Sequence, residues 1–277
     1  MFISTIHSFE SLEMLKNSGI DAVIIGIPCF SIRHTIEVKL EDLFVWKKKC
    51  DELNIKLYVN CLKFVHENEI GQLKNTLSFL KEINVDGIYY GDEGVLYEAI
   101  QLNMQDKLIY QPETLVTSSN DVNFYMSCGI QAVSLAHELS LEEICSIASK
   151  NQNVEVLIHG YYSIMYSRRP LIKNYFNAIK KEIDLSKSYD LIEQTRKDRM
   201  PIIQSEYGTT VFSEHPKGSY FQFHRLNSVG IRRFRIDSIF FDDAWCANVV
   251  ESYINHTSLF GYDDSWYNKE SILRKDD

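Results

Sequence analysis

The sequence lacks the features that would place it in a membrane or an oxidising compartment. No apolar run is long enough to cross a bilayer, and the Met1 end has no basic segment followed by an apolar core. The six cysteines are scattered and form no Cys-x-x-Cys pair, which is typical of reduced and buried thiols. We therefore expect a cytoplasmic protein with no membrane association.

Common catalytic motifs are missing as well. The chain has no Gly-x-x-x-x-Gly-Lys loop for phosphate, no Gly-x-Gly-x-x-Gly, no His-Glu-x-x-His and no Gly-x-Ser-x-Gly. Its histidines and acidic residues show no recognised metal-ligand spacing, so we expect no metal site. The formal net charge of -9 argues against a general nucleic-acid coat protein but permits a local basic patch.

The chain does contain eight short, mostly continuous apolar runs that alternate with amphipathic segments. The runs are Phe2–Ile6, Ala22–Ile25, Lys56–Asn60, Gly87–Tyr90, Lys107–Tyr110, Ala132–Leu135, Val154–Ile158 and Arg233–Ile236. Such runs are typical of strands covered on both faces, as in parallel sheets. The alternation predicts an α/β fold of the (β/α)8 TIM-like barrel type. A doubly wound open sheet is the alternative, because periodicity does not show closure.

Apolar residues at helical spacing predict helices between these runs. The clearest are Ser8–Asn17, Leu40–Leu53, Glu67–Ile83 and Leu141–Lys150. Ser140 and Glu143 form the pattern of a capping box before the last of them. The segment Leu171–Tyr207 interrupts the alternation and predicts an insertion between strands 7 and 8. We therefore expect one barrel domain over residues 1–258, with the insertion at 171–207, and a C-terminal tail over 259–277.

In a barrel of this kind, function lies at the carboxyl ends of the strands, where polar residues follow most of the predicted runs. We predict as catalytic residues Asp92, Glu138, His159 and Asp237. We predict as substrate-binding residues Arg33, Asn60, Gln111, His137, Tyr162 and Arg168. Guanidinium groups suit carboxylate or phosphate, and tyrosine rings suit stacking on a base.

Several of these residues also have a purely structural interpretation. Asp92 and Asp237 can cap the helices that follow them. His159 can hydrogen-bond to the backbone, and so can the amides of Asn60 and Gln111. The sequence alone does not separate these interpretations from the functional ones.

Short motifs spread along the chain match one known family. They are Ser11-Leu12 with Gly19–Gly26, Phe30–Arg33, Val85–Gly94, Val133–Ser140, the strand that ends in His159-Gly160, and Gly230–Asp237. Together they resemble the peptidase U32 family, also called the collagenase-like peptidase family. The resemblance covers about Met1 to Tyr253 and implies a barrel-like core. The family usually has arginine at the position of His137, so this chain departs from the pattern there.

The resemblance also bears on cofactors. Family members with the best-supported roles hydroxylate RNA bases or a quinone precursor, and their cysteines around and beyond the His-Gly strand hold a four-iron four-sulfur cluster. Here no cysteine lies between Gly160 and Trp245, and Cys246 alone cannot hold a cluster that needs four thiolates. We therefore expect no iron–sulfur cofactor in this chain. Tyr166–Leu171 and Glu206–Thr209 resemble the shorter, cysteine-poor subset of low-GC Gram-positive bacteria.

Three functions stay open at this point. Members of that subset are linked to tRNA wobble-uridine hydroxylation, which implies tRNA and a longer, cysteine-bearing paralogue as partners and a prephenate-derived oxygen donor. The family name implies a peptidase, for which Glu138 with Asp92 or Asp237 would be the paired carboxylates. The missing cysteines also suit a non-catalytic barrel subunit. The sequence does not decide whether the chain is itself an enzyme.

Overall fold

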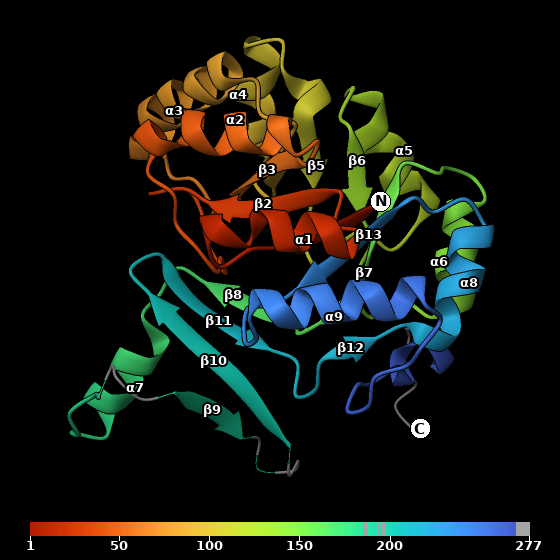
Figure 1. Ribbon diagram of the computed structural model, residues 1–277. Coiled ribbons are helices and arrows are strands. Elements are labelled where there is room, and N and C mark those ends of the chain that lie inside the picture. The colour runs from red at the N-terminus through yellow and green to blue at the C-terminus, as the bar shows by residue number, and fades with distance from the viewer. Residues whose placement is uncertain (185–187, 193, 195–197, 270–277) are drawn as a thin grey trace.

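The structure, a computed structural model, describes residues 1–184, 188–192, 194 and 198–269. Its parallel strands are β1 (Phe2–Thr5), β2 (Ala22–Gly26), β3 (Lys56–Cys61), β4 (Gly87–Tyr90), β5 (Leu108–Tyr110), β6 (Ala132–Ser134), β7 (Val154–Gly160) and β13 (Arg233–Asp237). Each strand pairs in parallel with the next one from β1 to β7, and β13 pairs with both β7 and β1. The eight strands therefore close into a barrel (Figure 1). The predicted TIM-like barrel is confirmed, and the closure excludes the open-sheet alternative.

Helices surround the barrel (Figure 1). They are α1 (Leu12–Ser18), α2 (Leu43–Glu52), α3 (Ile70–Ile83), α4 (Glu93–Gln101), α5 (Ser119–Ser127), α6 (Leu141–Ala148), α8 (Tyr220–Ser228) and α9 (Asp243–Ile254). Three of them begin with a 3-10 turn, over Phe9–Ser11, Leu40–Asp42 and Glu67–Glu69. The predicted capping box of α6 is present, since the Ser140 hydroxyl accepts a hydrogen bond from the Glu143 amide. No helix in the described part of the chain has the length and apolarity to span a bilayer.

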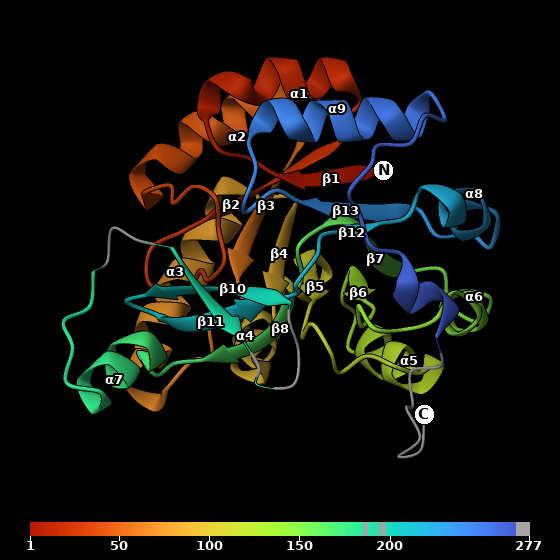
Figure 2. The same cartoon turned by 90° about the horizontal axis from the view of Figure 1, so that it is seen from below.

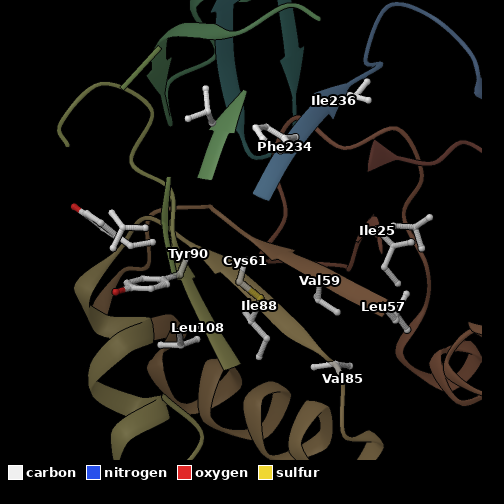
Figure 3. Close-up of a cluster of buried hydrophobic side chains, with 14 of the residues drawn as sticks. Ile25, Leu57, Val59, Cys61, Val85, Ile88, Tyr90, Leu108, Phe234 and Ile236 are labelled. Atoms are coloured by element: carbon white, nitrogen blue, oxygen red, sulfur yellow. The ribbon is translucent and has the colours of Figure 1, made fainter. Parts of the chain in front are cut away.

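Alternate residues of each strand face two different cores. The larger core lies between the barrel and its helices and includes Val59, Cys61, Ile88, Tyr90 and Leu108 (Figure 3). The smaller core fills the barrel interior and includes Ile24, Tyr58, Tyr89 and Ile109. Both faces of β1 to β6 are therefore covered by apolar side chains, whereas β13 presents Arg233 and Arg235 to the interior. This double burial explains why the strands appear in the sequence as continuous apolar runs.

The barrel interior also holds a buried ion network. Glu155 of β7 is fully buried and accepts a hydrogen bond of 2.7 Å from the hydroxyl of Tyr89. It pairs with Arg233 at 3.3 Å and with Arg235 at 3.4 Å, which offsets the cost of burying its charge. Arg235 also lies 3.4 Å from Asp237 at the end of β13. The network thus links the interior to the carboxyl ends of the strands, which we call the mouth.

A four-stranded antiparallel sheet is inserted between β7 and β13, and we call it the insertion sheet. It consists of β8 (Ser163–Ser167), β9 (Tyr189–Ile192), β10 (Arg199–Ser205) and β11 (Gly208–Phe212), with α7 (Leu171–Ala178) beside it. Figures 1 and 2 show it projecting to one side of the barrel. It spans residues 163–212, so it contains the predicted 171–207 segment and adds a strand at each end. The predicted insertion between strands 7 and 8 is confirmed.

Two contacts anchor the insertion sheet to the loops of the mouth. Arg168 donates two hydrogen bonds to Glu69, of 2.9 and 3.0 Å, and Lys63 pairs with the same carboxylate at 2.9 Å. Burial would raise the pKa of Glu69, but the hydrogen bonds from Lys63 and Arg168 lower it to about 2. The hydroxyl of Tyr207 accepts a hydrogen bond of 3.0 Å from the amide of Cys29. These contacts hold the sheet beside the ends of β2 and β3.

The C-terminal segment packs beside the end of β7. The short strand β12 (Lys217–Gly218) pairs antiparallel with β7, and the amide of Gly218 donates to the carbonyl of Asp263 at 3.1 Å. The ammonium of Lys217 is buried and donates to the carbonyl of His137 at 2.9 Å. Of the predicted tail over 259–277, residues 270–277 lie outside the described residues.

Candidate functional site

A cluster of charged and polar side chains occupies the mouth. Arg33, from the loop after β2, lies 2.7 Å from the Glu113 carboxylate, from the loop after β5. The same carboxylate accepts a hydrogen bond of 2.6 Å from the side-chain amide of Gln111. Its other oxygen lies 2.5 Å from Nε2 of His137. Loops after three strands therefore converge on one carboxylate.

Burial and charge set the protonation states in this cluster. Burial alone would raise the pKa of Glu113, but the charge of Arg33, followed by His137, holds it well below its usual range. Burial lowers the pKa of His137 to about 4, although Glu113 opposes this shift. We therefore assign a carboxylate to Glu113 and a neutral imidazole to His137 near pH 7. Arg33 is then the main counter-charge of Glu113.

The end of β13 completes the cluster. Arg235 lies 3.4 Å from Nε2 of His137 and 3.4 Å from the carboxylate of Asp237. The other oxygen of Asp237 accepts a hydrogen bond of 3.2 Å from the amide of Ile239. Burial raises the pKa of Asp237, although Arg235 opposes the shift. We use the name mouth cluster for Arg33, Gln111, Glu113, His137, Arg235 and Asp237.

Two cavities lie between the mouth and the insertion sheet. The first, of about 230 Å³, has mainly apolar walls, and its lining includes Leu62, Phe64, Pro112, Leu115 and Met165. The second, of about 280 Å³, likewise has mainly apolar walls, but its lining includes the polar side chains of His7, His34, Thr35, Ser205 and Thr210. Arg33 lines both of them, so its guanidinium is the charged group that they share. We call the first the apolar cavity and, for the polar side chains named in its lining, the second the polar cavity.

The structure brings several of the predicted site residues together. Arg33, Gln111, His137 and Asp237 all belong to the mouth cluster. Tyr162 lies next to it, with its ring 5.4 Å from the ring of His137. Arg33 and Gln111 also line the apolar cavity. These residues come from different loops and share no helix face, so only the closed barrel makes them neighbours.

Other predicted residues are engaged in structural contacts. One oxygen of Asp92 caps α4 by accepting from the amide of Gly94 at 2.8 Å, and the other accepts from the amide of Val65 at 3.0 Å. The Asn60 amide donates to the carbonyl of Ile32 at 2.7 Å and so holds the loop after β2. Both side chains shape the loops of the mouth.

Two further predicted residues lie outside the mouth cluster. Arg168 is committed to Glu69, where it anchors the insertion sheet. Glu138 is half-buried in the loop after β6. Asp92 has both oxygens in structural contacts, and Asp237 pairs with Arg235. The pairing of Glu138 with either of them, considered for a peptidase, stays a prediction.

A β-bulge near the end of β7 turns the side chain of His159 away from the mouth. Arg235 pairs with Leu157, whereas the next residue, Ile236, pairs with His159. Ile158 is therefore the extra residue of the bulge. Because an extra residue reverses the alternation of side chains, Ile158 and His159 both face the layer of helices outside the barrel.

His159 accordingly packs among aromatic rings. Its Nδ1 lies 3.1 Å from the hydroxyl of Tyr253, and its ring centroid is 3.9 Å from that of Tyr262. The rings of Tyr220 and Trp245 lie 5.2 and 5.4 Å away. Burial lowers the pKa of His159 to about 3. We therefore assign His159 to the aromatic layer beneath α8 and α9 and not to the mouth cluster.

Glu113 is the central residue that sequence reasoning missed. It follows the fifth predicted strand in the segment Gln111-Pro112-Glu113, and that acidic residue two positions after Gln111 is the available signal. Its backbone has a φ of 71°, a left-handed conformation that is uncommon for a residue other than glycine. No sequence pattern here predicts that turn, which aims the carboxylate at Arg33.

The cysteines lie on separate elements. Cys50 on α2, Cys61 at the end of β3 and Cys246 on α9 are buried, and burial raises the pKa of each to about 12. Among the described residues, no three His, Cys, Asp or Glu side chains are placed to hold a metal ion. A cluster with four thiolate ligands therefore does not fit the part of the chain that the structure describes.

A closed parallel barrel with an ionic cluster at the carboxyl ends of its strands defines a TIM-barrel protein. The model of peptidase family U32 matches residues 7–267, so the chain belongs to this family. The resemblance drawn from the sequence motifs is thereby confirmed.

The chain is similar to proteins named for tRNA hydroxylation. It is 27% identical to tRNA hydroxylation protein P2 of Bacillus subtilis (strain 168), over 86% of this chain and 79% of that protein. It is 25% identical to tRNA hydroxylation protein P1 of the same strain, over 62% of this chain but only 41% of that longer protein. The solved structure of the U32 peptidase Mk0906 is 11% identical, with a TM-score of 0.54 over 85% of this chain and 91% of that one. That structural likeness supports the fold alone.

Proposed function

We propose that this protein acts in the hydroxylation of the tRNA wobble uridine. The similarity to protein P2 over most of both chains carries the proposal. The mouth supports it, because Arg33 offers a guanidinium that suits phosphate and the neighbouring apolar cavity offers walls that suit a base. In this proposal, Arg33 and Gln111 bind the substrate. Neutral His137 and Asp237 are the groups at the mouth that can accept a proton.

We further propose that a longer, cysteine-bearing paralogue supplies the redox chemistry. The dispersed cysteines of the described chain support this division of work. So does the existence of both a P1 and a P2 protein in Bacillus subtilis, of which P1 extends well beyond the part that this chain matches. A prephenate-derived donor would supply the oxygen atom. The cytoplasm is the proposed compartment, since tRNA is found there and all six cysteines are free thiols.

Mass spectrometry of modified nucleosides tests this function. We would compare tRNA from four strains of the native host: wild type, a deletion of this gene, a deletion of the paralogue, and the double deletion. If the two proteins act together, each single deletion abolishes the hydroxyuridine derivatives. If they act independently, each single deletion lowers the level and only the double deletion abolishes it. The proposal is contradicted if deletion of this gene leaves the amount of hydroxyuridine derivatives unchanged both in the wild type and in the strain that lacks the paralogue.

Co-purification tests the partner. A tagged copy of this protein, expressed from its own locus, should recover the longer paralogue after gentle lysis. A matched strain that carries the tag on an unrelated cytoplasmic protein is the control. Recovery of tRNA without the paralogue would support tRNA as the substrate and would contradict the proposal that the paralogue is a partner.

A further inference from the structure

Two residues with left-handed backbones meet at the mouth. Arg33 has a φ of 54° and Glu113 a φ of 71°, and their side chains form the 2.7 Å ion pair. The amide of Thr114 donates to the carbonyl of Pro112 at 2.9 Å, which closes a γ-turn with Glu113 at its centre. A γ-turn of this hand is rare and strained. Strained backbone of this kind is typical of positions that take part in binding or switching.

The ion pair stands where the two cavities adjoin. The residues that line both cavities are Ile32, Arg33 and Tyr166, so these three side chains form the partition. Each cavity, at about 230 and about 280 Å³, is smaller than the ~300 Å³ at which ligand pockets usually begin. Together they exceed that size. A ligand that fills both must therefore pass the guanidinium of Arg33.

The chemistry of the walls restricts such a ligand. The apolar cavity offers Phe64, Pro112 and Met165 to a flat, weakly polar group such as a base. The polar cavity offers Thr210 and also Thr35, whose hydroxyl donates to the carbonyl of Ile6 and can still accept a hydrogen bond. The group that passes Arg33 must carry negative charge between two neutral parts. A phosphodiester has its charge in that position, whereas a carboxylate usually ends a molecule.

We propose that the two cavities are halves of one site for a single-stranded nucleic-acid segment, and that the Glu113 carboxylate occupies the place of the bridging phosphate on Arg33. This proposal rests on the function proposed above. When a phosphate takes over Arg33, Glu113 keeps its other partners, the amide of Gln111 and Nε2 of His137. The carboxylate can therefore yield one partner without being left alone in a buried place.

Calorimetric titration of the purified full chain tests the proposal with four probes: uridine, uridine 5′-monophosphate, inorganic phosphate and the trinucleotide UpUpU. The variant Glu113→Gln removes the competing charge, so it should bind UpUpU about tenfold more tightly than wild type. Because Glu113 also lines the apolar cavity, its affinity for uridine is measured beside it and should gain less than the affinity for UpUpU. Arg33→Gln should bind UpUpU at least about tenfold more weakly. Glu142→Gln, the same change at an exposed glutamate, should match wild type with every probe.

Three results would overturn the proposal. One is a Glu113→Gln variant that folds, by its melting curve, yet binds UpUpU no more tightly than wild type. Another is an equal gain for uridine, which has no phosphate. The third is inorganic phosphate that binds as well as UpUpU, because it would show a site for a small anion only.

Salt dependence gives a second test if Glu113→Gln does not fold. The slope of log affinity for UpUpU against log salt should be smaller in Arg33→Gln than in wild type by about 0.7, the value for one single-strand phosphate contact. An equal slope in both proteins refutes the contact. Since these titrations need no tRNA hydroxylation, normal hydroxyuridine in the deletion strain together with the predicted affinities would reject the proposed function and keep the binding site.

Discussion

Two histidines end neighbouring strands of the barrel and have opposite surroundings. His137, after β6, meets Glu113 and lies 3.4 Å from Arg235 in the charged mouth. His159, in β7, is enclosed by the rings of Tyr253 and Tyr262 outside the barrel wall. Both are buried, and burial lowers the pKa of both. A position at a strand end therefore does not decide whether a side chain reaches the mouth, because one bulged residue is enough to turn it away.

The largest effect is expected at Gly160, which follows His159. Its φ is 109°, and a Cβ atom there would lie 2.0 Å from the backbone oxygen of Asp237. We expect Gly160→Ala to cost more than about 4 kcal/mol of unfolding free energy or to prevent folding, because both backbones would have to move. Urea denaturation followed by circular dichroism measures this.

Gly71 provides the matched control for that substitution. It lies in α3, and a Cβ atom there meets nothing within 4 Å. Gly71→Ala should therefore stabilise the protein by about 0.5–1 kcal/mol, the usual gain from replacing glycine in a helix. A Gly160→Ala variant as stable as wild type would mean that the end of β7 is not held as described.

The next effect separates packing from chemistry at His159. His159→Ala should destabilise the protein by about 3 kcal/mol, because it empties a space lined by aromatic rings. His159→Phe replaces the imidazole by a somewhat larger aromatic ring that still fills the space, and it should cost less than about 1.5 kcal/mol, including the lost contact with Tyr253. Thermal melting of both variants tests this order. A folded His159→Phe variant that is as unstable as His159→Ala would contradict the packing role.

A smaller effect concerns pH. Both histidines have a folded pKa, of about 4 and about 3, that lies below the value of 6.5 in the unfolded chain. Between pH 6.5 and about 4 the unfolded state therefore binds more protons, so stability falls as the pH falls. In this range each histidine should lower the unfolding free energy by about 1.4 kcal/mol for every pH unit by which the pH falls.

His159→Phe should remove one of these two contributions. Urea denaturation of wild type and variant at several pH values between 6.5 and 4.5 measures the difference. Carboxylates with a lowered pKa, such as Glu69, lose their stabilising contribution only below their unfolded value of 4.5. His34, whose pKa burial lowers, and Asp237, whose pKa burial raises, are present in both proteins, so the difference between the two slopes reports on His159. If the unfolding free energy of both proteins changed equally with pH, His159 would take up a proton in the folded state at the same pH as in the unfolded chain.

The strands and helices could be predicted from the sequence because burial on both faces leaves a local signal. All eight barrel strands lie within one or two residues of the predicted runs, and Gly87–Tyr90 matches β4 at both ends. The capping box of Ser140 and Glu143 likewise depends on residues three positions apart. The number and alternation of the runs predicted a barrel, but its closure depends on the pairing of β13 with both β1 and β7, which periodicity does not show.

The arrangement of the mouth could be predicted only in part, because distant residues set it. The bulge at Ile158 is stabilised by two hydrogen bonds that the carbonyl of Ile158 accepts from the hydroxyls of Ser219 and Tyr253. Both donors lie far from Ile158 in the sequence. The left-handed turn at Glu113 brings its carboxylate to Arg33, 80 positions earlier in the sequence. Apolar periodicity carries no information on either contact.

The most direct test of the account compares Arg33 with His159 in the cell. The deletion strain would be complemented with Arg33→Gln or with His159→Phe, and immunoblotting would verify equal amounts of the two proteins. Mass spectrometry would then measure hydroxyuridine derivatives in tRNA. The account predicts that His159→Phe restores the modification and that Arg33→Gln does not. Restoration by Arg33→Gln, together with failure of an equally abundant His159→Phe, would contradict it.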